Sequence, residues 1–166
     1  MILTNLIALI FLIILVTTLA SVVKGGPYVP SDQKTIKKML DFLQIKKGEK
    51  IADIGSGDGR IVIALAKKGA LAYGYEINPL LVIWSKIKIS RGGLKGKAFV
   101  YWKNFWKVDL SGFDDVSVYA INYVMSDLEK KFQKELKPGT KVVSHTFKFS
   151  SLKLSKKVKG VYLYQI

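Results

Sequence analysis

A glycine-rich turn that carries two acidic residues is the segment of this sequence best suited to bind a ligand. It reads D-I-G-S-G-D-G-R over residues 53–60 and follows a short apolar run. Alternating glycines let the backbone approach a ligand closely, at the sheet edge where open α/β folds bind nucleotides. The third glycine stands one residue earlier than in the dinucleotide fingerprint G-x-G-x-x-G. No Gly-Lys-Ser/Thr follows, which excludes a phosphate-binding P-loop.

The acidic residues of this turn, Asp53 and Asp58, indicate the charge of the ligand. Two carboxylates would repel a pyrophosphate, whereas they would attract an amino group or a sulfonium. The alternative interpretation is a tight strand-to-helix turn that binds nothing. Three glycines combined with two acids favour a ligand.

Glu76 ends the next expected strand, 17 residues after Gly59. This separation is close to the offset of about 20 residues at which a carboxylate accepts hydrogen bonds from ribose hydroxyls. Together with the turn, Glu76 predicts a nucleoside ligand that has a cationic extension and no phosphate. S-adenosyl-L-methionine fits this description.

The composition excludes several other classes of chemistry. The chain has no cysteine, which excludes a disulfide scaffold, a cysteine-ligated zinc site and a thiol nucleophile. His145 is the single histidine, so we expect neither a histidine metal cluster nor a Ser-His-Asp triad. We predict no metal site, and we expect His145 to be structural rather than a catalytic base.

The elements that would hold the turn and Glu76 alternate between strands and helices. Apolar runs predict strands at 50–54, 71–75, 98–102, 116–121, 141–149 and 161–166. Helical spacing predicts helices that start near residues 31, 60, 78 and 124. This alternation predicts an α/β, Rossmann-like fold with a mostly parallel sheet and helices on both faces. Only 161–166 reads as a strand after 141–149, so we expect an abbreviated final hairpin.

The N-terminal segment is apolar and contains no charged side chain up to Val23. As a helix, Ile2–Val23 would be roughly 33 Å long, enough to cross the ~30 Å hydrocarbon core. We therefore predict a transmembrane anchor over 1–23, a linker with an N-terminal helix over 24–48, and a ligand-binding domain over 49–166. A cleaved signal peptide is the alternative, but no Lys or Arg precedes the apolar run. Lys24 and the basic domain predict a single-pass membrane protein with residues 24–166 in the cytoplasm.

The chain is strongly basic, with a net charge of +15. Seven Lys or Arg and no acid lie between Asn78 and Val108, and seven more lysines follow Glu135. Such runs form solvated faces, attract anionic lipid headgroups, or bind nucleic acid. The apolar N-terminus favours the lipid bilayer as partner over RNA.

Four segments together resemble a known family. D-I-G-S-G-D-G-R followed by G-Y-E-I-N-P-L-L-V resembles the class I, seven-strand S-adenosylmethionine-dependent methyltransferases. G-G-P-Y-V-P-S and L-E-K-K-F-Q-K-E-L resemble the membrane-anchored protein-lysine methyltransferases of mitochondria and their prokaryotic relatives, which modify the adenine nucleotide translocase and the ATP synthase c-subunit. The match covers about residues 24–150. It implies that 49–166 is a methyltransferase domain that uses S-adenosyl-L-methionine to methylate a lysine of a membrane protein.

The resemblance also implies roles for single residues. Glu76 would hold the ribose, and Asn104, with Phe105 behind it, would contact adenine. Asn104 stands where the family usually has an acid. The resemblance also makes Tyr28 a candidate lid over the active site. The chain departs from the family after the fourth strand, where relatives tend to carry Val-Pro and this sequence has Ile121-Asn122-Tyr123. We choose Asn122, independently of the resemblance, as the residue that orients the acceptor. The complete predicted cofactor set is Asp53, Gly55, Ser56, Gly57, Asp58, Gly59, Glu76, Asn104 and Phe105.

The chemistry expected of such an enzyme is an in-line displacement at the sulfonium methyl, to which proximity and orientation contribute most. A lysine acceptor must first lose a proton, and an aromatic, desolvated pocket would lower its usual pKa of about 10.4. Two alternatives remain open: an RNA methyltransferase that uses the lysine-rich surface, and a non-enzymatic membrane protein that retains the fold.

Overall fold

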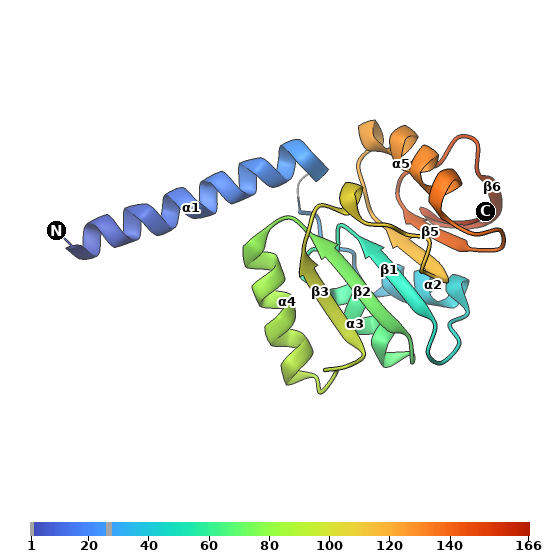
Figure 1. Cartoon of the computed structure of the whole chain (residues 1–166), viewed down its shortest axis with the longest axis horizontal. Coiled ribbons are helices and arrows are strands. Elements are labelled where there is room, and N and C mark those ends of the chain that lie inside the picture. Colours follow the sequence, from blue (N-terminus) through green and yellow to red (C-terminus); the bar gives the residue numbers. More distant parts are fainter. Residues whose placement is uncertain (1, 26–27) are drawn as a thin grey trace.

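A seven-stranded sheet flanked by helices forms the body of the protein, and a separate helix precedes it (Figure 1). The computed structural model describes residues 2–25 and 28–166. The strands are β1 (Lys50–Ile54), β2 (Leu71–Glu76), β3 (Ala98–Trp102), β4 (Asp115–Val118), β5 (Lys141–His145), β6 (Lys153–Val158) and β7 (Val161–Gln165). The helices are α1 (Ile2–Gly25), α2 (Gln33–Leu43), α3 (Arg60–Lys67), α4 (Pro79–Arg91) and α5 (Asn122–Glu135), with a short 3-10 helix over Phe105–Lys107.

The sheet has the strand order β3-β2-β1-β4-β5-β7-β6. Neighbours from β3 to β5 are parallel, and β7 pairs antiparallel with both β5 and β6. The predicted mostly parallel α/β sheet is therefore confirmed. The order reverses between β1 and β4, and open α/β sheets bind ligands at such a switch point, beyond the carboxyl ends of the strands.

Helices cover both faces of the sheet, as the sequence predicts. On one face α2, α3 and α4 pack against the strands through a cluster that includes Leu43, Leu65 and Val82. On the other face α5 contributes Leu128 and Phe132 to a second cluster. Alternate strand residues feed the two clusters, because successive side chains of a strand point to opposite faces.

Short local signals set the ends of the helices. Asp32, one residue after the expected start, caps α2 by accepting a 3.0 Å hydrogen bond from the backbone N–H of Thr35. Asn78 caps α4 through the N–H of Leu80 at 3.0 Å, and Pro79 occupies its first position. An oxygen acceptor at the N-cap with proline next to it is a favoured helix start. This cap fixes where α4 leaves the carboxyl edge of the sheet.

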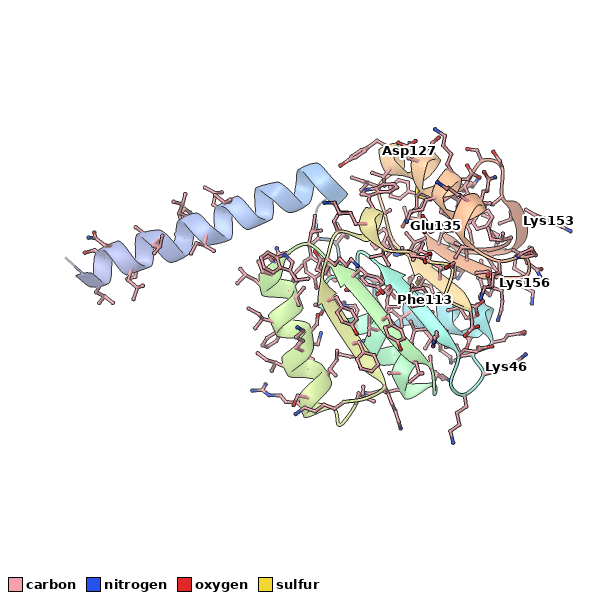
Figure 2. The ribbon with its side chains drawn as sticks, viewed as in Figure 1. Lys46, Phe113, Asp127, Glu135, Lys153 and Lys156 are labelled. Atoms are coloured by element: carbon pink, nitrogen blue, oxygen red, sulfur yellow. The ribbon has the colours of Figure 1, made fainter. Side chains whose placement is uncertain are left out.

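The expectation of an abbreviated final hairpin is wrong. Residues Lys153–Val158 form the outer strand β6, which pairs with β7 through its backbone. Every side chain of β6 is exposed, including Lys153 and Lys156 at the sheet edge (Figure 2). A strand without a buried face has no alternation of apolar and polar residues, so the sequence pattern does not predict it. Lysines on an edge strand also oppose edge-to-edge pairing.

The helix expected over 1–23 is present as α1 and ends at Gly25. It extends away from the α/β body (Figure 1). Across residues 2–25 and 28–166, no helix meets the length and apolarity that crossing a membrane requires. The structure thus does not support the predicted transmembrane span. Gly26 and Pro27 of the expected linker lie outside the described residues.

Candidate active site

A cavity of about 520 Å³ opens at the carboxyl ends of β1, β2 and β4, at the switch point of the sheet. Its walls come from segments far apart in the sequence. They are residues 28–31 before α2, 54–61 without Gly59 after β1, 75–78 with Leu81 at the start of α4, Phe105, residues 119–121 after β4, and Phe147. The topology therefore brings the predicted glycine turn and the end of the second strand to one cavity.

The glycine turn has a backbone that other residues would not adopt easily. Gly55, Gly57 and Gly59 have φ angles of 73°, 54° and 75°, in the left-handed region that favours glycine. A Cβ on Gly57 would lie 2.9 Å from the Tyr28 ring, and a Cβ on Gly59 would lie 2.8 Å from the Ser85 side chain. The turn thus exposes bare backbone to the cavity at Gly57 and packs against α4 at Gly59.

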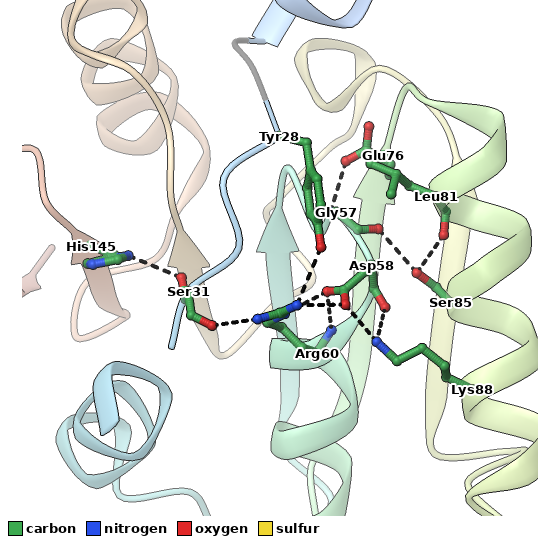
Figure 3. A network of polar contacts seen from close by, with 10 residues as sticks. All are labelled: Tyr28, Ser31, Gly57, Asp58, Arg60, Glu76, Leu81, Ser85, Lys88 and His145. Carbon is green, nitrogen blue, oxygen red and sulfur yellow. Dashed lines mark hydrogen bonds and ion pairs between the residues drawn. The ribbon is translucent and has the colours of Figure 1, made fainter. Parts of the chain in front are cut away.

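Glu76 connects the end of β2 to this turn. Its buried carboxylate accepts hydrogen bonds from the backbone N–H groups of Gly57 at 2.9 Å, Ile77 at 2.8 Å and Asn78 at 2.7 Å. Figure 3 shows the side chain reaching toward Gly57. A carboxylate has about four lone-pair sites. Three donors leave room for a further donor from a ligand in the cavity.

The charge of Asp58 is balanced within the protein. Its carboxylate pairs with Arg60 at 2.8 Å and with Lys88 of α4 at 2.7 Å (Figure 3). Burial opposes ionisation of Asp58, but the hydrogen bonds and charges of Arg60 and Lys88 prevail and lower its pKa to about 2. Asp58 is therefore ionised but offers a ligand little uncompensated charge, in contrast to the simple attraction read from the sequence. The separation of 30 residues from Lys88 hides this pairing from sequence reasoning.

Asp53 lies behind the cavity rather than in its wall. One carboxylate oxygen accepts a 2.5 Å hydrogen bond from the Ser117 hydroxyl, and the other has no hydrogen-bond partner. Burial, together with the charges of Glu76 and Asp58, raises the pKa of Asp53 to about 7. The Ser56 hydroxyl in the cavity wall is also buried without a partner. The Ser56 hydroxyl lies against Gly74 of β2, so both unpartnered oxygens are on the sheet side of the turn and not in the open cavity.

Hydrogen bonds hold the segment before α2, residues 28–31, against the cavity. Tyr28 covers Gly57, and its hydroxyl accepts a 3.4 Å hydrogen bond from Arg60. Arg60 also donates to the backbone oxygen of Ser31 at 2.8 Å, while the Ser31 hydroxyl lies 3.1 Å from Nδ1 of His145 (Figure 3). Burial lowers the pKa of His145. Tyr28 thus has the position of a lid, and His145 has the structural partner that we expected.

The predicted site residues fall into two groups. The cavity wall contains Tyr28, Gly55, Ser56, Gly57, Asp58, Glu76 and Phe105. Asp53, Gly59, Asn104 and Asn122 lie outside the wall. Asn104 caps the 3-10 helix by accepting a 3.0 Å hydrogen bond from the N–H of Trp106, and Asn122 is the exposed first residue of α5. Their roles toward a ligand remain predictions.

Many wall residues were not singled out in the sequence. Tyr119, Ile121 and Phe147 follow β4 and β5 and line the side of the cavity toward α5. The Tyr119 ring packs against the His145 ring with centroids 4.2 Å apart. Their position after predicted strands is the one signal that could have identified them, since carboxyl ends of parallel strands meet at one edge.

The arrangement suits a nucleoside ligand with a polar extension at the turn, beside an apolar and aromatic entrance. Within the described parts of the chain, no group of three or more His, Asp or Glu side chains is placed to hold a metal ion. The cavity is large enough to hold and orient two organic reactants, and Tyr28 and Phe147 are among its aromatic lining residues.

The family model described as ANTKMT methyltransferase domain matches residues 53–156. The chain is 42% identical over 123 residues to a human lysine N-methyltransferase of the ATP synthase c-subunit, covering 74% of this chain and 52% of that protein. It is 38% identical over 129 residues to a protein-lysine N-methyltransferase of Saccharolobus islandicus, covering 76% of this chain and 80% of that protein. The chain thus spans about half the length of the human relative.

Solved structures give the same fold. A crystal structure of an RNA methyltransferase from Salinibacter ruber in complex with S-adenosyl-L-homocysteine superposes with a TM-score of 0.80. The two chains are 30% identical, and the match covers 83% of this chain and 94% of that chain.

Proposed function

The chain belongs to the ANTKMT methyltransferase domain family, and from this membership we propose that it is an S-adenosyl-L-methionine-dependent protein-lysine N-methyltransferase. The observation that carries the proposal is the cavity at the switch point, where the glycine turn and Glu76 face one space. Relatives of 42% and 38% identity are named as lysine N-methyltransferases, and the second is matched over 80% of its length.

The residues present fit this cofactor. The backbone of the turn at Gly55 and Gly57 would face its methionine part, and the Glu76 carboxylate would accept a hydrogen bond from a ribose hydroxyl. Phe105 would contact the adenine ring, with Asn104 at its edge as the resemblance implies. When bound, the cofactor supplies a methyl group on a sulfonium. The residues that line the cavity would hold that group in place for transfer.

The entrance suits a lysine side chain. Tyr28, Tyr119, Ile121 and Phe147 give the cavity wall an aromatic and apolar part, which we take as the acceptor entrance. Such surroundings disfavour the ammonium form and lower the pKa of an entering lysine from about 10.4. The neutral amine is the nucleophile, and its proton leaves to water before transfer. Asn122 is exposed at the start of α5, and we propose that its side chain orients the acceptor lysine of the substrate protein.

We propose a membrane protein as the substrate and the cytoplasmic membrane surface as the place of action. The relatives are named for the ATP synthase c-subunit and for the adenine nucleotide translocase, both membrane proteins. S-adenosyl-L-methionine is made in the cytoplasm, and the domain is basic, which suits the anionic cytoplasmic leaflet. Protease added to right-side-out vesicles should leave the domain intact; digestion there would overturn the placement.

Mass spectrometry of membrane fractions tests the proposed reaction. Full-length protein and labelled S-adenosyl-L-methionine should add methyl groups to lysines of one or a few membrane proteins. The control is the Gly57→Ala variant, whose added Cβ would meet the Tyr28 ring. Binding of S-adenosyl-L-homocysteine without methylation of any protein or RNA would instead favour a non-enzymatic protein that retains the fold.

An RNA methyltransferase is the second candidate, because the Salinibacter ruber structure carries that description at 30% identity. The exposed lysines of the chain would supply the phosphate contacts that RNA binding needs. The same labelling reaction separates the two candidates. Label that is removed by ribonuclease would favour RNA, and label that is removed by protease would favour a protein lysine.

A further inference from the structure

Helix α4 presents an apolar face to solvent. Leu80, Ile83, Trp84 and Ile87 are exposed by 41%, 56%, 51% and 37%, and their i, i+3, i+4, i+7 spacing puts them on one side of the helix. We name these four residues the α4 stripe. The buried residues of α4 are Val82, Ser85 and Ile89, which face the sheet. The core of the domain therefore does not use the α4 stripe.

The other long helices of the domain differ from α4. Exposed positions of α2 are Gln33, Lys34, Lys37 and Asp41. Those of α5 are polar (Asn122, Ser126, Asp127, Lys130, Gln133 and Lys134) except for Tyr123 in its first turn. Single exposed apolar residues need no explanation, but a contiguous apolar patch marks an interaction surface. Figure 2 shows side chains of α4 projecting on the side away from the sheet.

Trp102 extends this surface from the edge strand β3. Its side chain is 69% exposed, and its indole N–H donates a 2.9 Å hydrogen bond to the backbone oxygen of Ile77, just before α4. This hydrogen bond holds the indole ring beside the start of α4 and gives the indole N–H a partner. The surface therefore combines the aliphatic side chains and Trp84 of α4 with one aromatic residue of β3 at its rim.

The segment that carries the α4 stripe and Trp102 is basic. No acid occurs between Asn78 and Val108. Lys88 pairs with Asp58 in the site. The exposed basic residues of the same segment are Lys86, Arg91, Lys95, Lys97, Lys103 and Lys107. A partner for this surface must be apolar at its centre and negatively charged at its border.

We propose that the α4 stripe and Trp102 dock on a lipid bilayer that contains anionic lipids. Tryptophan is enriched where hydrocarbon meets headgroups, and lysines beside such a surface are attracted to anionic lipids. An amphipathic helix can bury its apolar face in the headgroup boundary. Helix α1 supplies a second apolar surface in the same chain, since Leu3, Phe11 and other large apolar side chains of α1 are exposed.

The topology relates this surface to the active-site cavity. Helix α4 begins at the carboxyl edge of the sheet, where Asn78 and Leu81 line the cavity. The segment that connects α1 to the domain ends at Tyr28, in the wall of the same cavity. Docking through α4 would therefore hold the cavity close to the headgroups. Docking on the bilayer does not depend on which molecule accepts the methyl group.

A site-specific nitroxide tests the proposal, because the chain has no cysteine. We would label full-length Ile83→Cys, and as a matched control Leu154→Cys, which lies on β6 at the opposite sheet edge and is 49% exposed. Both would be bound to vesicles of phosphatidylcholine with about 30% phosphatidylglycerol. Power saturation then compares accessibility to oxygen, which partitions into the bilayer, and to a water-soluble nickel chelate.

The label at position 83 should gain oxygen accessibility and lose nickel accessibility, while the label at 154 should remain accessible to nickel. Adding Trp84→Gln and Ile87→Gln to Ile83→Cys should abolish most of this shift, with circular dichroism and S-adenosyl-L-homocysteine binding showing that the fold is retained. A label at 83 that stays open to nickel on bound protein would refute docking. An equal shift on pure phosphatidylcholine would refute the anionic partner.

Discussion

The carboxylate of Glu76 accepts a 2.9 Å hydrogen bond from the backbone N–H of Gly57. This bond joins the end of β2 to the turn that follows β1, across the cavity wall. The two predicted halves of the cofactor site are thus held together by the group that would bind the ribose.

Glu76→Ala should weaken binding of S-adenosyl-L-homocysteine by about 10- to 150-fold, which corresponds to about 1.5–3 kcal/mol for hydrogen bonds to a charged group. Isothermal titration calorimetry measures the change. Glu135→Ala is the control, because Glu135 pairs with Lys131 of α5 outside the cavity wall. Parental affinity in Glu76→Ala would mean that the ribose lies elsewhere.

Gly57→Ala should abolish cofactor binding, because the new Cβ would lie 2.9 Å from the Tyr28 ring at a φ of +54°. Gly93→Ala provides a control with similar backbone strain, since Gly93 has a φ of +66° and no atom within 4 Å of the added Cβ. Both variants should lose about 1–2 kcal/mol of stability. Equal cofactor affinity in the two variants would contradict a close approach at Gly57.

Asp53→Asn should flatten the pH dependence of stability between about pH 4 and 7. Burial raises the folded-state pKa of Asp53 to about 7, so in this window the folded protein holds a proton that the unfolded chain has released. The free energy of unfolding therefore falls as pH rises, by up to about 1.4 kcal/mol per pH unit. Urea denaturation from pH 4.5 to 8 checks this. Parallel curves for the parent and Asp53→Asn would show that Asp53 does not titrate there.

Glu129→Ala should lower the free energy of unfolding by about 1–3 kcal/mol, because part-buried backbone N–H groups lose a charged acceptor. Glu129 of α5 is buried and accepts hydrogen bonds from the N–H groups of Ser151 at 2.6 Å and Leu152 at 2.7 Å, just before β6. Chemical denaturation measures the loss. Glu49→Ala removes only an exposed bond to the N–H of Lys46 and should change stability by less than about 0.5 kcal/mol.

The sequence by itself determined the alternation of strands and helices from β1 to β5, because helix and strand periodicities and caps such as Asn78 are local. It also determined the φ-positive turn at Gly55 to Gly59, since glycines at that spacing follow a buried strand. It missed β6, whose exposed side chains carry no periodic signal. The hydrogen bonds that define β6 come from β7 instead.

Only the tertiary structure decided how the site is closed and how its charges are balanced. Three contacts join residues that are about 30 apart in the chain: Tyr28 lies over Gly57, Arg60 donates a hydrogen bond to Ser31, and Lys88 pairs with Asp58. The Ser31 contact to His145 spans 114 residues. Composition and spacing give the number of charges but not their separation, and electrostatic energy and pKa depend on distance and burial. Sequence therefore predicted that the glycine turn and Glu76 meet at the sheet edge, whereas packing decided which side chains line the cavity there.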